Sequence, residues 1–411
     1  MKKLLSVLLV LLMAVNLAAC GNNQDAGKQT EANKAEATKA ADEEKTEKES
    51  KEADKKSESE PAKDAGTIKV AVVGPMTGPS QEYGIGFQYA TQVAVDQINA
   101  KGGINGRKVE LKVFDNKATG EEGVAIAQLI AGEGDFYGVV GHFGDTMVIG
   151  KTYEDAGVIY IAPAASSIGF TDQGEHVFRL NATIQTETEA MFVCADKIGK
   201  KKLGIVAFNN DWGAKATDIL KEALEKDNPE GYEIVAVENV LGGDMDYTSV
   251  ISNLKEKGAE VAVMFCYYDS VVPFSIMAEK SYPELRIVAG GNCFNDTFLE
   301  VGGQDVEGCM APTVFDTSAD DPASKQFVED YRKLSGGMNP SYLSAQAYDA
   351  MSIILQAAES TNGELDRDAL RAFVADEKHT GVTGDCTFDE NRDAVRNFFP
   401  MMVKDGMWVN P

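Results

Sequence analysis

The chain has 411 residues and a formal net charge of −26, from 39 Lys and Arg residues against 65 Asp and Glu residues. This acidic excess argues against a nucleic-acid-binding protein, because such a protein needs a cationic surface to displace counterions from phosphates. Apolar residues make up 44% and charged residues 25% of the chain. This composition is ordinary for a globular protein, and the length predicts two or three domains.

The first twenty residues are typical of an export signal. Lys2 and Lys3 precede an apolar run over residues 4–15, which is too short for a comfortable bilayer span. The run ends in the segment LAACG at residues 17–21, which resembles the lipobox of bacterial lipoproteins. The resemblance implies that Cys20 receives a diacylglycerol and becomes the mature N-terminus. An ordinary cleaved signal with an incidental Cys20 is the alternative.

Residues 21–66 have the composition of a tether. They include 13 acidic residues and nine lysines and no Val, Ile, Leu, Met, Phe, Trp, Tyr or Cys. Such a segment cannot bury enough apolar surface to offset its chain entropy, so we expect a disordered, charged stalk. The remainder of the chain is therefore predicted to be extracytoplasmic and anchored to the cell membrane by the lipid.

From residue 67 onward the hydrophobic pattern alternates between strand and helix. In a first series, strands are predicted at residues 67–73, 109–114, 137–140 and 159–161, and helices at 84–100, 123–132 and 147–157. In a second series, strands are predicted at 203–208, 234–238, 261–266 and 287–290, and helices at 214–226, 247–257 and 271–280. This alternation with short loops indicates an α/β protein with two lobes, each a doubly wound parallel sheet.

After residue 312 the pattern becomes mostly helical. Helices are predicted at residues 323–334, 341–358 and 368–375, with too few strands for a third sheet. We therefore expect these helices to pack onto an existing lobe. Trp408 and Val409 are expected to close the chain in a hairpin with the segment near residues 398–403.

Signatures of catalysis and metal binding are absent from the sequence. It contains no P-loop, zinc-protease, hydrolase-elbow or dinucleotide-binding motif and no CxxC spacing. We therefore predict that the protein is not an enzyme and holds no cofactor and no metal. His142 has no nucleophile nearby and is interpreted as a hydrogen-bonded structural group. Cys293 and Cys309 are the one candidate disulfide pair, with buried free thiols as the alternative.

Five segments of the chain occur in an order that points to a known family. They are KVAVVGPMTGPSQEYG at residues 69–84, DQINAKGGING at 96–106, VGH at 140–142, APAAS at 162–166, and Phe178 with Arg179. Together they resemble the leucine/isoleucine/valine-binding protein family, the extracytoplasmic ligand-binding proteins of ABC transporters. The resemblance implies the type I periplasmic-binding-protein architecture, two Rossmann-like (flavodoxin-like) lobes joined by three hinge crossovers. Lobe 1 is then residues 67–181 and 313–383, and lobe 2 is residues 182–312 and 384–411.

The resemblance also implies how a ligand is held. Ala164, Ala165 and Ser166 match a family turn whose backbone and hydroxyl groups grip the α-carboxylate and ammonium of the ligand. Exposed backbone groups and a hydroxyl that both donates and accepts are suited to this task.

Three aromatic residues complete the ligand site that the resemblance implies. Tyr83 matches the aromatic residue of the first loop that covers the ligand, and Trp212 occupies the position of an aromatic lid from lobe 2. Tyr267 falls at another ligand contact, with Tyr268 as the alternative in a register shifted by one residue.

Two positions depart from the family pattern. Asp145 stands where the amino-acid binders place a serine for the carboxylate, and Asn292 stands where they place a lobe 2 glutamate for the ammonium. Asp145 could cap the helix that starts at Thr146, with Thr146 or backbone amides holding the carboxylate. It could instead pair with the cationic group of the ligand. In the third interpretation, the ligand is not an α-amino acid.

These observations predict a monomeric binding lipoprotein of an ABC importer. It is expected to capture a small amino acid, branched-chain or similar, by closure of the two lobes and to deliver it to a membrane permease. One alternative keeps the fold and the transport role for an amide, urea, a polyamine or an aromatic acid. The other is a ligand-sensing module that acts with a separate receptor.

Overall fold

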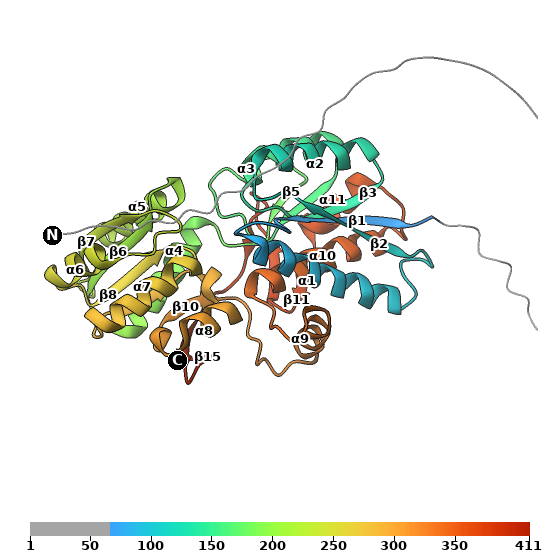
Figure 1. Ribbon diagram of the computed structural model, residues 1–411. Helices are drawn as coiled ribbons and strands as arrows, with labels where there is room; N and C mark the ends of the chain where they lie inside the picture. Colours follow the sequence, from blue (N-terminus) through green and yellow to red (C-terminus); the bar gives the residue numbers. More distant parts are fainter. Residues whose placement is uncertain (1–65) are drawn as a thin grey trace, which may run out of the picture. The chain divides into compact units, whose positions relative to one another are not determined.

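The computed structural model describes residues 66–411, so the predicted signal, Cys20 and the stalk up to residue 65 lie outside the described residues. Strands and helices alternate from β1 onward, as the hydrophobic pattern predicts (Figure 1). In this part of the chain, no helix combines the length and the apolar character that a bilayer crossing requires.

The first sheet has the strand order β2-β1-β3-β4-β5, and neighbouring strands run parallel. Its strands are β1 (Ile68–Gly74), β2 (Val109–Asp115), β3 (Phe136–Gly141), β4 (Ile159–Ala162) and β5 (Val177–Arg179). They are connected by helices α1 (Gln81–Ala100), α2 (Gly120–Glu133) and α3 (Thr146–Ala156). The direction of strand addition reverses between β1 and β3, which opens a crevice at the carboxyl edge of the sheet.

Two hydrophobic cores cover the two faces of this sheet. Successive residues of β1 alternate between them, with Val70 and Val72 in one core and Ala71 and Val73 in the other. The first core also contains side chains of α1 and of the helix α10 (Tyr342–Ser360), which packs along α1 (Figure 1). The helices α9 (Pro322–Ser335) and α11 (Arg367–Asp376) pack against α1 and α10, respectively. The C-terminal helices therefore complete the core that the N-terminal strand begins.

The second sheet repeats the same winding and then extends it. Its order is β15-β14-β10-β9-β8-β6-β7, in which β7, β6, β8, β9 and β10 are parallel. The parallel strands are β6 (Lys202–Phe208), β7 (Glu233–Val240), β8 (Val261–Phe265), β9 (Arg286–Ala289) and β10 (Met310–Thr313). The antiparallel strands β14 (Phe399–Lys404) and β15 (Met407–Val409) form the predicted C-terminal hairpin.

Five helices belong to this second part of the chain. They are α4 (Ile184–Ile198), α5 (Asp211–Lys226), α6 (Thr248–Glu256), α7 (Tyr268–Ser281) and α8 (Asp296–Gly302). Side chains of α4 and α5 lie in one core, and those of α6, α7 and α8 lie in the core on the opposite face of the sheet. The sequence pattern predicts α5, α6 and α7 but does not reveal α4 or α8.

A third, small sheet corrects the expectation that the C-terminal region has too few strands for one. It consists of β11 (His379–Gly381), β12 (Gly384–Phe388) and β13 (Ala394–Val395) in antiparallel pairing. Cys386 and Phe388 belong to the same core as α1 and α10. This packing differs from the predicted boundary, which assigns residues 384–411 to lobe 2. Strands of two to five residues are too short to produce a clear alternating pattern.

Arg179 fastens the segment after β12 to the first sheet. Its side chain is 3% exposed, and its Nε donates a 2.6 Å hydrogen bond to Asp393 Oδ1. The guanidinium also donates to the carbonyl of Ser167 at 2.8 Å, and the Arg179 amide donates to the carbonyl of Arg392 at 3.0 Å. This ion pair therefore connects two segments that are more than 200 residues apart.

We expect Asp393→Ala to lower the free energy of unfolding by about 3 kcal/mol, because it leaves the buried Arg179 guanidinium without its anionic partner. The control is Asp155→Ala, which removes an exposed carboxylate paired with Lys151 and is expected to cost less than about 1 kcal/mol. Chemical denaturation followed by circular dichroism measures both values. Equal losses of stability in the two variants would contradict the stabilising role of the ion pair between Arg179 and Asp393.

Candidate ligand-binding site

A cavity of about 310 Å³ is lined by residues from both large sheets. Wall residues follow all five strands of the first sheet and β6, β8 and β9 of the second, where parallel strands present their carboxyl ends, and α10 adds Tyr342 and Leu343. All nine residues predicted from the sequence as ligand contacts lie in this wall. They are Tyr83, Asp145, Thr146, Ala164, Ala165, Ser166, Trp212, Tyr267 and Asn292.

The turn at Ala164, Ala165 and Ser166 is held in place from behind. The side chain of Gln346 on α10 donates to the carbonyl of Pro163 at 2.8 Å, and the carbonyl of Ser166 accepts from the amide of Ile184 at 2.9 Å. The hydroxyl of Ser166 makes no hydrogen bond among residues 66–411, so it is free to contact a ligand. Rigid backbone with one free hydroxyl is suited to orienting a small polar group.

Asp145 stands at the N-cap position of α3, but its side chain accepts no capping hydrogen bond. Its Oδ2 lies 2.6 Å from Nδ1 of His142 instead, and Nε2 of His142 lies 2.8 Å from the hydroxyl of Tyr153. The Asp145 and His142 side chains have no exposed surface. The interpretation of Asp145 as a helix cap is therefore wrong, and His142 is the hydrogen-bonded group that the sequence predicts.

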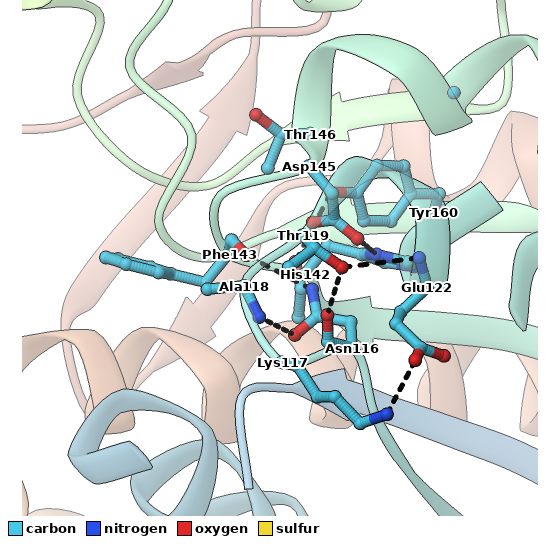
Figure 2. A network of polar contacts seen from close by, with 12 residues as sticks. Asn116, Lys117, Ala118, Thr119, Glu122, His142, Phe143, Asp145, Thr146 and Tyr160 are labelled. Atoms are coloured by element: carbon cyan, nitrogen blue, oxygen red, sulfur yellow. Dashed lines mark hydrogen bonds and ion pairs between the residues drawn. The ribbon is translucent and has the colours of Figure 1, made fainter. Parts of the chain in front are cut away.

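The chain around Asp145 is shaped to enclose its carboxylate. A Cβ atom added to Gly123 would lie 1.9 Å from Asp145 Oδ2, so only glycine fits at this point of α2. Asn116 fixes the adjacent turn by donating to the carbonyl of Phe143 at 3.1 Å and accepting from the amide of Ala118 at 3.2 Å (Figure 2). Asp145 therefore lies in the cavity wall while its carboxylate is turned into the protein interior, and its Oδ1 has no partner there.

Aromatic rings form a large part of the wall. Tyr83 stacks on Phe143 with ring centroids 4.5 Å apart, and Trp212 stacks on Tyr267 with centroids 5.6 Å apart. The ring of Phe143 points away from the polar network around His142 (Figure 2). The two stacked pairs meet at Tyr83 and Tyr267, whose centroids are 6.3 Å apart. Burial raises the pKa of Tyr267 to about 12, so its phenol is neutral at physiological pH.

Glu187 is the wall residue that the sequence interpretation missed. It lies in the first turn of α4, and the indole N–H of Trp212 donates to its Oε2 at 3.4 Å. Burial raises the pKa of Glu187 from 4.5 to about 7, and the indole hydrogen bond offsets only part of this shift. One sequence signal could have identified Glu187: it is an acidic residue on the apolar face of a helix, between Ile184 and Met191.

Asn292 is already engaged with the protein. Its side-chain amide donates to the backbone carbonyl of Cys266 at 3.4 Å, and its backbone carbonyl accepts from the side chain of Asn295 at 2.8 Å. The five cysteines of the described chain are free and buried, so the candidate pair of Cys293 and Cys309 is not joined. The cavity wall includes no Lys, Arg or His among residues 66–411, and this part of the chain shows no cluster of metal-ligating side chains.

A cavity built at the carboxyl edges of two parallel α/β sheets, with aromatic walls and a few polar groups, defines a solute-binding protein. The chain belongs to the periplasmic binding protein family, whose profile matches residues 67–407. The "Leucine-, isoleucine-, valine-, threonine-, and alanine-binding protein" of Pseudomonas aeruginosa is 27% identical over 342 residues, which cover 81% of this chain and 88% of that protein.

Solved structures show the same architecture. The branched-chain amino acid transporter substrate-binding protein LivJ of Streptococcus pneumoniae, in complex with isoleucine, superposes with a TM-score of 0.73 at 25% identity. This match covers 84% of the present chain and 98% of LivJ. A Rhodopseudomonas palustris solute-binding protein in complex with 3,4-dihydroxybenzoic acid shares the fold, with a TM-score of 0.74 at 22% identity and coverage of 84% and 95%.

We expect Glu187→Gln to stabilise the ligand-free protein at pH 8. The folded-state pKa of Glu187 is about 7 and exceeds the ordinary value of 4.5, so between these two pH values the unfolded chain binds fewer protons than the folded chain. The free energy of unfolding therefore falls as the pH rises through this range. Above pH 7 the ionised carboxylate then costs on the order of 3 kcal/mol.

Melting temperatures at pH 5 and pH 8 test this expectation, with a gain of several degrees at pH 8 and a much smaller one at pH 5. Glu189→Gln is the matched control, because Glu189 is exposed on the same helix. A similar shift in both variants would argue against a specific cost at Glu187.

Proposed function

We propose that the protein captures a small amino acid, branched-chain or similar, in the cavity between its two sheets for an ABC importer. The observation that carries this proposal is the convergence of all nine predicted contact residues on one cavity. The amino-acid-binding relatives in Pseudomonas aeruginosa and Streptococcus pneumoniae support the same ligand class. Delivery of the ligand to a membrane permease is part of the proposal.

The α-carboxylate of the ligand is assigned to the first-sheet side of the cavity. Ser166 offers a free hydroxyl there, Ala165 offers backbone groups, and Thr146 begins helix α3. The positive end of a helix dipole and unpaired N–H groups favour an anion at this point. The enclosed carboxylate of Asp145 does not face the ligand directly, which removes the main objection to an anionic group in this place.

Capture is proposed to occur by closure of the two lobes. Trp212 and Tyr267 on the second-sheet side act as a lid over the ligand, opposite Tyr83. Contacts from both sides favour the closed form, and a shift from mostly open to mostly closed needs several kcal/mol of differential binding.

An aromatic acid is the second candidate ligand. The stacked rings of the wall favour a flat apolar group. The Rhodopseudomonas palustris protein of the same fold was solved with 3,4-dihydroxybenzoic acid.

The cellular placement completes the proposal. We propose that the protein is a monomer that is held outside the cytoplasmic membrane by a lipid on Cys20 and a stalk of about 46 residues. The lipobox at residues 17–21 and the apolar-poor composition of residues 21–66 support this placement.

A thermal-shift panel tests the ligand class. Residues 21–411 are unfolded and refolded to remove bound ligand, and then mixed with the twenty amino acids, small amides, urea, polyamines and aromatic acids. A rise of several degrees with leucine, isoleucine or valine is the expected result. A response to aromatic acids alone supports the second candidate, and no response to any compound contradicts the proposal.

We expect Ser166→Ala to weaken amino-acid binding at least tenfold, because it removes the one free hydroxyl of the carboxylate-binding turn. Isothermal titration calorimetry measures the affinity, and circular dichroism checks that the fold is retained. Ser281→Ala, at an exposed position of α7, is the control and should bind like the wild type. Unchanged affinity in Ser166→Ala would remove this residue from the site.

A further inference from the structure

We propose that Glu187 binds an ammonium group of the ligand and that this contact selects amino acids over carboxylic acids without a nitrogen. The inference rests on the proposed function, because it takes the cavity as the ligand site. Beyond the proposed function, it names Glu187 as the residue that selects the ligand and an ammonium as the chemical group that the ligand must carry.

Glu187 has an unused carboxylate oxygen in the cavity wall. The residue is 9% exposed, and its Oε2 accepts one long hydrogen bond from Trp212 Nε1. Its Oε1 has no hydrogen-bond partner, and the carboxylate has no ion pair, within residues 66–411. The other cavity carboxylate, Asp145, is committed to His142 and has no exposed surface. Glu187 is therefore the acid that a ligand can reach.

The groups that face Glu187 are aromatic and uncharged. Trp212 comes from α5, Tyr267 precedes α7 and Tyr342 comes from α10, so three aromatic residues from three elements surround the carboxylate. Burial raises the pKa of both tyrosines, which keeps them neutral. Aromatic faces attract cations, and a carboxylate at their centre adds a charge-assisted hydrogen bond. These surroundings thus favour a cationic group next to Glu187. They provide no partner for the carboxylate of a ligand at this place.

Without ligand, Glu187 is not fully ionised near neutral pH. Burial holds its pKa at about 7, so the carboxyl is partly protonated near neutral pH. A ligand ammonium next to Oε1 favours the ionised form and lowers this pKa. Binding of such a ligand should therefore weaken as the pH falls below about 7. A carboxylic acid without a nitrogen lacks this ammonium contact and leaves the buried carboxyl unpaired or protonated, so it loses the binding free energy that the contact contributes.

The experiment compares two pairs of probes that differ only in the ammonium group. They are leucine against 4-methylpentanoate and phenylalanine against 3-phenylpropanoate, and benzoate is added as an aromatic acid. Calorimetry at pH 8 and pH 6 is carried out on refolded wild-type protein, Glu187→Gln and Glu189→Gln. The last variant is the control, because it makes the same charge change at an exposed position two residues further along α4.

We expect the wild type and Glu189→Gln to bind at least one of the two amino acids, with roughly tenfold weaker binding at pH 6 than at pH 8. Glu187→Gln should bind that amino acid about a hundredfold more weakly and lose the pH dependence, while its discrimination against the matching acid disappears.

Two results would overturn the inference and leave the proposed capture role in place. One is unchanged amino-acid affinity and pH dependence in Glu187→Gln, and the other is wild-type binding of a nitrogen-free acid as tightly as its amino acid. Failure of the wild type to bind any of the five probes and any compound of the thermal-shift panel overturns the proposed function itself.

Discussion

The order of the strands in the two parallel sheets is the constraint on which the rest of the structure depends. In both sheets the first strand of the series lies inside, between the second and the third, so the direction of strand addition reverses beside it while all of these strands stay parallel. Loops after neighbouring strands then diverge to opposite faces and leave room at the carboxyl edge. Tyr83, the turn at Ser166, Trp212 and Tyr267 all follow strands at such an edge. A binding cavity is thus a consequence of the winding, and side-chain chemistry decides only what it binds.

Much of this arrangement could be predicted from the sequence, for identifiable reasons. Buried parallel strands such as β1 and β8 are continuous apolar runs, and long helices such as α1 and α10 show a regular apolar stripe. Helix α4 was missed because its first turn is polar, and the small sheet was missed because its strands are short. The nine wall residues could be named because they follow strand ends and match a family pattern residue by residue.

The sequence could not show which way the acidic side chains turn. Asp145 faces the interior because His142 adopts a left-handed backbone conformation with φ of 60° and because Gly123 leaves space for the carboxylate. Neither condition can be recognised in the chain before the fold brings α2 and α3 together. Glu187 presents the reverse case, since a residue in an unpredicted helix becomes a cavity acid only when α4 packs beside Trp212. Placement of charge is a tertiary property here, whereas placement of the cavity follows from topology.

The packing of α10 along α1 has a consequence for how the chain acquires its structure. The two helices share one core although roughly 250 residues separate them, and β12 adds to that core from still further along the chain. A growing polypeptide therefore cannot finish its N-terminal half until almost the whole sequence has been synthesised. Contacts between such distant segments slow folding and prolong the time in which apolar surface is open to chaperones.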